Sequence, residues 1–150
     1  MKMDVAAILI KRAALEFDRI SNAALEAYDL TPAQFRVVKY ICDEAESGVR
    51  IVDLERYFSM SHPTAIGIVQ NLEKKGLAEY RDNPGNARSR FIVPSARAMA
   101  LREALEDVGD ALEAELTKNL SERERLRLVA LLKKMMGLSN MNKTAGGITT

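Results

Sequence analysis

The chain has 150 residues, a length that suits one compact domain or a small domain with helical extensions. Hydrophobic residues make up 47% of it and charged residues 29%, which predicts a folded protein and excludes an intrinsically disordered one. No apolar stretch approaches the roughly 18 residues that span a bilayer, and the first residues lack the pattern of a secretory signal. We therefore expect a cytoplasmic protein without a membrane partner.

Two residue types limit the chemistry. Cys42 is the only cysteine and His62 the only histidine. A disulfide within the chain is therefore excluded, and no cluster of cysteine and histidine is available for a metal. The two residues are far apart in sequence, and no glycine-rich phosphate loop accompanies them, so no nucleophile and base can be recognised. We expect no catalytic residue, no metal site and no cofactor.

The net charge of +1 hides an uneven distribution of charge. Residues 81–102 contain five arginines and a single aspartate, whereas residues 103–115 contain six acidic residues and no basic one. A basic segment followed by an acidic one is expected when one surface faces phosphates and another does not.

The first predicted helix covers residues 4–27, which contain regularly spaced apolar residues and neither glycine nor proline. Thr31, Pro32 and Gln34 then form a capping-box pattern with proline in the first turn, which predicts a second helix that ends near Gly48. Cys42 falls on this second helix. An oxidant sensor and a buried structural cysteine are the alternatives, and the apolar surroundings favour the buried cysteine.

Two short helices and a hairpin follow. A compact helix over 52–58 precedes a turn at 59–60, and a second helix begins at Ser61 and ends at Gly76. The periodicity then changes, because residues 77–82 and 90–93 resemble strands joined by the turn-forming residues 83–86.

Two more helices are predicted after the hairpin. Ser95 has the position of an N-cap for a long helix with leucine and valine at helical spacing. Ser121 and Glu124 form a second capping-box pattern, which opens a last helix. From residue 138 onward the sequence is rich in Ser, Asn, Thr and Gly, and we expect a disordered tail.

These elements predict a mostly α-helical fold with a small β-hairpin, which is a winged helix-turn-helix with helices added at both ends. Residues 31–94 would form the winged helix-turn-helix and residues 138–150 the tail. Residues 1–30 and 95–137 would form dimerisation helices, because their apolar faces exceed what the small central unit can cover.

A winged helix-turn-helix fits DNA for a geometric reason. An α-helix enters the major groove, while a basic hairpin beside it reaches the backbone or the neighbouring minor groove. The helix from Ser61 would read the DNA, and the arginines of the hairpin would contact the backbone. The predicted DNA-binding residues are Ser61, His62, Thr64, Gly67, Gln70, Asn71, Lys74, Arg88 and Arg90.

Several stretches resemble the MarR family of bacterial regulators, over about residues 5–137. The residues LTPAQFRVVKYI are similar to the second helix of that family, SHPTAIGIVQNLEKKGLAEYRD to its recognition helix and first wing strand, and LSERERLRLVALLKKM to its last helix. The resemblance implies a homodimer that binds pseudo-palindromic double-stranded DNA as a transcriptional regulator. It also implies release by oxidation or by a small-molecule effector, whose identity stays unknown.

Several residues keep an alternative interpretation. Arg88 and Arg90 would contact DNA or be solvated or salt-bridged, and His62 would contact phosphate or cap its own helix. Gly67 would allow close approach of DNA, serve packing or be a neutral substitution. Ile66 and Gly67 stand where the family frequently has polar or basic residues, so we expect few base contacts. The alternative function is a winged-helix module that binds another protein without sequence-specific DNA binding.

Overall fold

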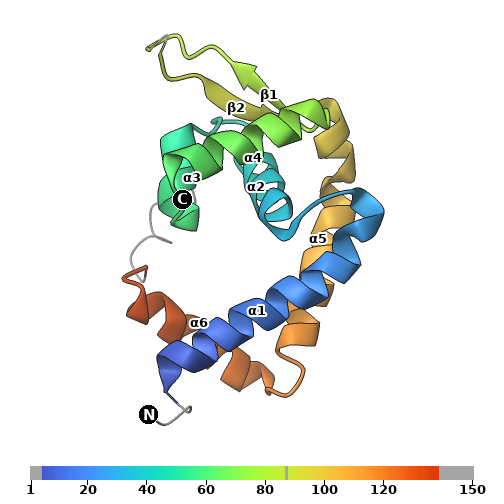
Figure 1. Cartoon of the computed structure of the whole chain (residues 1–150), viewed down its shortest axis with the longest axis vertical. Helices are drawn as coiled ribbons and strands as arrows, with labels where there is room; N and C mark the ends of the chain where they lie inside the picture. Colours follow the sequence, from blue (N-terminus) through green and yellow to red (C-terminus); the bar gives the residue numbers. More distant parts are fainter. Residues whose placement is uncertain (1–4, 87, 139–150) are drawn as a thin grey trace, which may run out of the picture. The chain divides into compact units, whose positions relative to one another are not determined.

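The computed structural model describes residues 5–86 and 88–138. They form, in chain order, α1 (Ala6–Leu25), a 3-10 turn η1 (Glu26–Tyr28), α2 (Pro32–Asp43), α3 (Ile51–Phe58), α4 (His62–Lys74), β1 (Ala78–Arg81), β2 (Phe91–Pro94), α5 (Ala96–Leu116) and α6 (Glu122–Met135) (Figure 1). The predicted mostly helical fold with one hairpin is confirmed. The disorder predicted for the tail concerns residues 139–150, which lie outside the described residues.

The chain divides into two units, residues 1–112 and residues 113–150. In the first unit, α2 contacts α4, α3 contacts α4, and α2 also contacts β2. In the second unit, α6 follows the last turn of α5. Across the described ranges no helix is long and apolar enough to cross a membrane.

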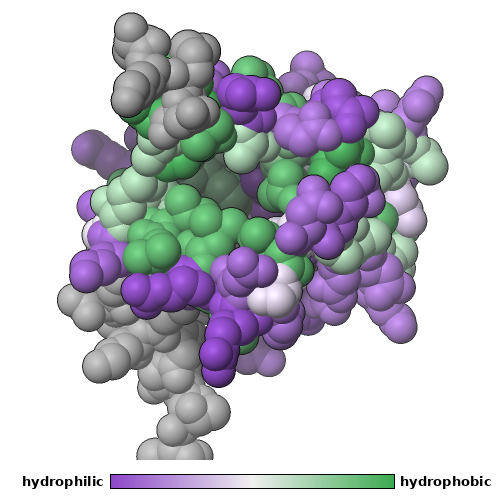
Figure 2. Space-filling model, turned by 90° about the horizontal axis from the view of Figure 1, so that it is seen from below, coloured by the Kyte–Doolittle hydropathy of each residue, from purple (hydrophilic) through white to green (hydrophobic). Residues whose placement is uncertain are grey.

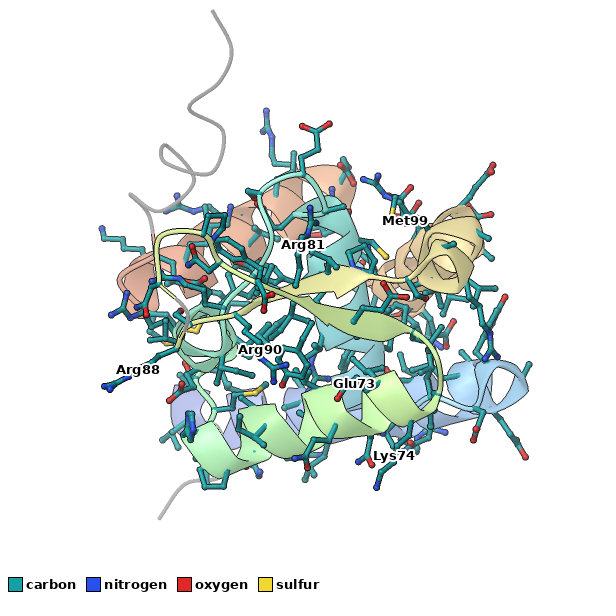
Figure 3. The ribbon with its side chains drawn as sticks, turned by 90° about the horizontal axis from the view of Figure 1, so that it is seen from above. Glu73, Lys74, Arg81, Arg88, Arg90 and Met99 are labelled. Atoms are coloured by element: carbon teal, nitrogen blue, oxygen red, sulfur yellow. The ribbon has the colours of Figure 1, made fainter. Side chains whose placement is uncertain are left out.

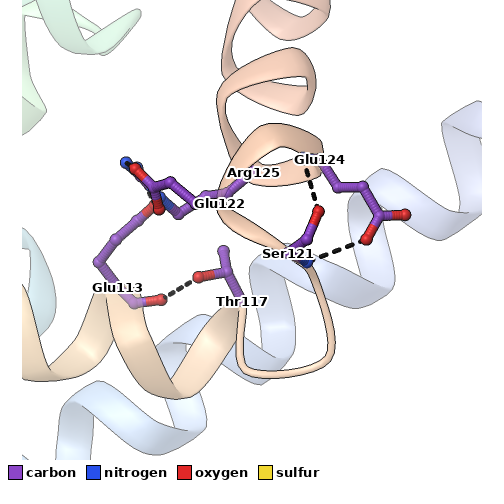
Figure 4. A network of polar contacts seen from close by, with 6 residues as sticks. All are labelled: Glu113, Thr117, Ser121, Glu122, Glu124 and Arg125. Atoms are coloured by element: carbon purple, nitrogen blue, oxygen red, sulfur yellow. Dashed lines mark hydrogen bonds and ion pairs between the residues drawn. The ribbon is translucent and has the colours of Figure 1, made fainter.

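Helix boundaries follow from local capping. At α2 the Thr31 hydroxyl accepts from the Gln34 N–H at 3.2 Å, and Gln34 Oε1 accepts from the Thr31 N–H at 3.2 Å, as predicted. At α6 the same box joins Ser121 and Glu124 at 2.9 and 3.2 Å (Figure 4). The first predicted helix ends earlier than expected as an α-helix, because after Leu25 the chain continues as the 3-10 turn η1, which ends at the left-handed Asp29 (φ 54°).

The second unit has its own polar network at the turn between α5 and α6. Arg125 pairs with Glu122 at 2.8 Å and with Glu113 at 3.3 Å, and the Thr117 hydroxyl donates to the Glu113 carbonyl at 2.7 Å (Figure 4). Arg125 therefore joins the end of α5 to the first turn of α6.

The core of the first unit lies between α2, α3, α4 and the hairpin, and it extends to the end of α1 and to the buried side of α5. Its fully buried side chains include Ile41, Leu54, Leu72 and Ile92. Cys42 belongs to this core with 1% of its surface exposed, so the prediction that it is buried is confirmed. Burial raises the pKa of its thiol, an effect that Arg102 only partly opposes.

The hairpin is fixed to the segment before α3. Strands β1 and β2 pair antiparallel, and Val49 bridges to Ile92 through N–H···O distances of 3.0 and 2.6 Å. Gly48 precedes this bridge with φ +76°, and a Cβ there would lie 2.9 Å from Phe91. Only glycine fits this position, which lets the segment before α3 pass close to Phe91 at the start of β2.

Candidate nucleic-acid interface

The N-terminal end of α4 is capped and exposed. Ser61 is the N-cap, and its hydroxyl accepts from the Thr64 N–H at 3.3 Å and donates to the Thr64 hydroxyl at 2.8 Å. His62 is the first helical residue, so the alternative that it caps its own helix is wrong. Its Nδ1 instead lies 3.2 Å from Glu55 Oε2 on α3, which holds the ring at the junction of the two helices.

The two faces of α4 follow the predicted pattern. Ala65, Ile68, Val69 and Leu72 are buried, whereas the side chains of the predicted reading face are exposed. Within the described part of the chain, no side-chain hydrogen bond engages Gln70, Asn71 or Lys74. These groups are therefore free to bond to a ligand.

Gly67 and Ile66 have different surroundings. A Cβ built at Gly67 meets no atom within 4 Å, so packing inside the protein does not require glycine there. The packing explanation for Gly67 is therefore wrong. Ile66 is half-buried and faces the hairpin side of α4.

A hollow of about 530 Å³ separates α4 from the hairpin. It is lined by three of the predicted DNA-binding residues, His62, Arg88 and Arg90, together with residues that were not predicted to bind DNA. Its lining residues are Arg50, Ile51, Val52, Glu55, His62, Ile66, Tyr80, Arg88, Ser89 and Arg90. Gln70, Asn71 and Lys74 lie farther along α4 and do not line it.

The two wing arginines are held differently. The Arg90 guanidinium lies 4.1 Å from the centre of the Tyr80 ring, a cation–π stack inside the hairpin. Arg88 points away from the molecule, whereas Arg90 lies between the hairpin and α4 (Figure 3). Burial raises the pKa of the Tyr80 hydroxyl, with a further contribution from Glu73. Sequence reasoning treated both arginines alike because a ring contact between Tyr80 of β1 and the residue before β2 leaves no local signal.

Arg50 adds a third guanidinium at the edge of the hollow. It donates to Asp53 at 2.9 and 3.1 Å, and its backbone N–H bonds to Asp53 Oδ2 at 2.9 Å. Burial acts to raise the pKa of Asp53, but the bonds from Arg50 outweigh it and hold this pKa below its usual value. The spacing of Arg50 and Asp53 at the start of a helix was the signal that sequence reasoning missed.

The described residues hold no group of three or more His, Cys, Asp or Glu side chains that could bind a metal. The hollow is lined by three guanidinium groups, an imidazole and a tyrosine ring, together with aliphatic side chains, Ser89 and the carboxylate of Glu55. Together with the exposed amides of α4, it offers donors to phosphate oxygens and to base edges.

Comparison with known proteins decides the family. Residues 28–89 match the profile of the MarR family. The multiple antibiotic resistance protein MarR of Escherichia coli strain K12 is 32% identical over 120 residues, which cover 79% of this chain and 82% of that protein. The chain belongs to the MarR family of transcriptional regulators. The resemblance predicted from the sequence is confirmed.

Solved MarR-family structures share the fold. A cysteine-to-serine mutant of E. coli MarR complexed with operator DNA has a TM-score of 0.76 and 32% identity, over 85% of this chain and 90% of that one. A Staphylococcus aureus MepR–DNA complex has a TM-score of 0.80 and 25% identity, over 89% of this chain and 97% of that one. The predicted winged helix-turn-helix is thereby confirmed for this MarR-family chain.

Proposed function

We propose that this chain regulates transcription by binding pseudo-palindromic double-stranded DNA as a homodimer, and that it acts as a repressor. The observation that carries the proposal is the exposed polar face of α4 beside a hairpin that presents two arginines. Its relatives MarR and MepR were solved with DNA, which favours this function over a protein-interaction module. We also propose that the protein acts in the cytoplasm.

The site divides into two kinds of contact. Gln70 and Asn71 carry amides on the exposed face of α4, and a side-chain amide can bond to both N6 and N7 on the major-groove edge of adenine. The hydroxyls of Ser61 and Thr64 and the backbone N–H of His62 suit phosphate. Among the first three residues of α4, Pro63 has no N–H and the N–H of Thr64 already bonds to Ser61. Arg88 and Arg90 add positive charge without a base-reading pattern. We therefore assign selection to α4 and sequence-independent affinity to the wing.

Gly67 and Lys74 complete the reading face. Because nothing inside the protein lies near the missing side chain of Gly67, its absence leaves room for DNA. Lys74 is exposed in the last turn of α4 and suits a phosphate contact. We also assign His62 to the DNA-facing side, where its ring contacts Glu55.

The helices of both ends leave apolar side chains exposed, and we assign residues 1–30 and 95–137 to dimerisation. Figure 2 shows hydrophobic surface on the face seen from below. The exposed large hydrophobic residues of α1, α5, α6 and their flanking residues are Val5, Leu9, Ile10, Leu15, Met99, Leu116, Leu120, Leu126, Leu128, Leu131, Met135 and Met136. A second copy of the chain is the partner that we assign to them, since homodimers bury such surface.

A two-fold dimer places two recognition helices in successive major grooves. The preferred site should then be an inverted repeat whose half-sites lie about 10 base pairs apart. Residues 31–94 would be the DNA-binding domain. The proposal includes a small-molecule effector but assigns no residue to it, and it includes no catalytic step.

Selection of bound duplexes by the purified protein, followed by a salt series, tests the proposal. The selected sequence should be an inverted repeat, and affinity should fall by about 10³-fold or more between about 50 and 200 mM salt if six or more phosphates are neutralised. A protein that bound no duplex, or bound duplexes without dependence on salt, would be a protein-interaction module instead.

A further inference from the structure

Lys75 follows α4 as its C-cap, and bonds from three other segments meet at this residue. Its Nζ donates to the carbonyl of Asp29 and, at 2.9 Å, to Gln34 Oε1. The carboxylate of Asp29 lies 3.8 Å from the same ammonium. The Lys75 carbonyl in turn accepts from the Arg97 guanidinium at 2.7 Å. One residue thus joins the end of the recognition helix to the turn after α1, to α2 and to α5.

The neighbouring Lys74 behaves differently. Its side chain is exposed and makes no hydrogen bond to the residues that the structure describes, and it points away from α4 (Figure 3). The Lys75 side chain is only 28% exposed, because its ammonium is directed at Asp29 and Gln34. Two adjacent lysines therefore have opposite orientations, one toward solvent and one toward the protein.

The acceptors of Lys75 are held in place by interactions that do not involve its ammonium group. Gln34 is 7% exposed, and its Oε1 already accepts from the Thr31 N–H in the capping box of α2. Asp29 has a fixed left-handed conformation between η1 and α2. Lys75 thus bonds to groups whose positions are set by the first turn of α2 and by the end of α1.

The chain directly after Lys75 is anchored as well. The Ser95 hydroxyl donates to the Gly76 carbonyl at 2.7 Å, and the Ser95 N–H donates to the Leu77 carbonyl at 3.1 Å. At the other end of α4, the His62 ring contacts Glu55 of the adjacent helix, and among the described residues it has no other side-chain partner. The C-terminal end of α4 is therefore the end that is tied to both helical extensions.

From this arrangement we infer that Lys75 is a positioning residue, which fixes the orientation of the recognition helix relative to α1 and α5. In a dimer held by the terminal helices, that orientation sets the distance between the two recognition helices. Lys75 would thereby determine which half-site spacing is preferred without contacting DNA. The inference rests on the proposed function, because it assumes the DNA-binding dimer.

Lys75→Met tests this role, since methionine retains an unbranched apolar stem and removes the donors. Affinities are measured for inverted repeats at the selected spacing, for repeats one base pair shorter and longer, and for random duplex. Loss of one or two hydrogen bonds from a charged donor should reduce the preference for the selected spacing roughly five- to tenfold. Affinity for random duplex and its salt dependence should not change.

Lys74→Met is the matched control. If Lys74 contacts a phosphate, this variant should weaken binding to every duplex equally and lower the salt slope by about one unit. Lys75→Met behaving like this control would overturn the inference, because Lys75 would then be a phosphate contact. An unchanged spacing preference would overturn it too.

A second variant strengthens the same contact, so that a poorly folded Lys75→Met protein leaves the inference testable. Gln34→Glu retains the capping-box pattern and gives Lys75 a charged acceptor. The preference for the selected spacing should rise, and an unchanged preference would count against the role of Lys75.

Spin labels on the recognition helices test the orientation without DNA. Glu73→Cys provides an exposed labelling position on α4, and the buried Cys42 should label poorly. The distance distribution between the two labels of the dimer should broaden with Lys75→Met and narrow with Gln34→Glu. If the wild-type dimer bound no duplex, the proposed function would fail, while these distances would still decide the role of Lys75. Identical distributions in all three proteins would overturn it.

Discussion

Helix α4 of the central unit and the last helix, α6, have equally clear amphipathic patterns, but the apolar face of α4 is buried and that of α6 is exposed. In α4 the side chains of Ala65, Ile68, Val69 and Leu72 are buried by α2, α3 and the hairpin. In α6 no residue is buried, and Leu131 and Met135 remain 46% and 57% exposed. A helix can thus be specified by its caps and periodicity without burial of its apolar face, and we assign the face of α6 to the proposed dimer.

The largest effect should follow from a cavity in the central core. Leu72→Ala removes a fully buried side chain, and we expect the free energy of unfolding to fall by about 2–5 kcal/mol. Denaturant unfolding at several protein concentrations measures this loss. Leu131→Ala provides the contrast, because its smaller cost should vary with protein concentration, as dimer stability does. A small cost for Leu72→Ala would mean that the two apolar faces do not differ.

The next effect concerns the exposed face of α6. Leu131→Asp combined with Met135→Asp should dissociate the dimer, since charge in an apolar interface is costly. Sedimentation at micromolar concentration should detect monomers, and affinity for the inverted repeat should fall toward that for a single half-site. Lys133→Asp is the control, because helical periodicity places it on the opposite side of α6 and the dimer should persist. A double variant that stays dimeric would exclude this face from the interface.

The two serine N-caps allow the same substitution in both regions. Ser61→Ala and Ser121→Ala each remove one cap, so we expect each to lower the free energy of unfolding by about 1 kcal/mol. Only Ser61→Ala should also weaken DNA binding, because Ser61 lies at the start of the recognition helix. Thermal unfolding and duplex affinity are measured on both variants, and equal losses of affinity would argue against this placement of the DNA.

The smallest effect should appear at alkaline pH. Burial raises the pKa of Cys42, so above the usual thiol pKa the unfolded chain loses a proton that the folded chain retains. The free energy of unfolding should therefore fall as pH rises from 7 to about 10. Tyr40 and Tyr80 have pKa values raised mainly by burial and contribute in the same direction. Cys42→Ala should show a shallower decline, and an identical decline would assign the effect to the tyrosines alone.

Local features of the fold were predictable from the sequence, because the interactions that specify them are local. Residues at most a few positions apart form the two predicted capping boxes, the Ser61 and Ser95 caps and the two faces of α4. The Arg50–Asp53 pair at the start of α3 is a local contact that sequence reasoning missed. The other missed contacts form between elements that must first pack together. Tyr80 stacks on Arg90, and Glu55 pairs with His62, only after the hairpin and the helices have packed. Lys74 and Lys75 are neighbouring residues of the same type, and only the tertiary structure distinguishes their surroundings.

The division between wing and recognition helix is the central claim, and salt-titrated affinities for the selected and the random duplex test it most directly. Arg88→Ala with Arg90→Ala should weaken both affinities similarly and lower the salt slope by about one unit per lost phosphate contact. Gln70→Ala with Asn71→Ala should spare the random duplex and cost about 1–3 kcal/mol of discrimination for each base pair read. If the arginine variant lost selectivity while the amide variant lost only overall affinity, the two roles would be reversed and the proposed division would be wrong.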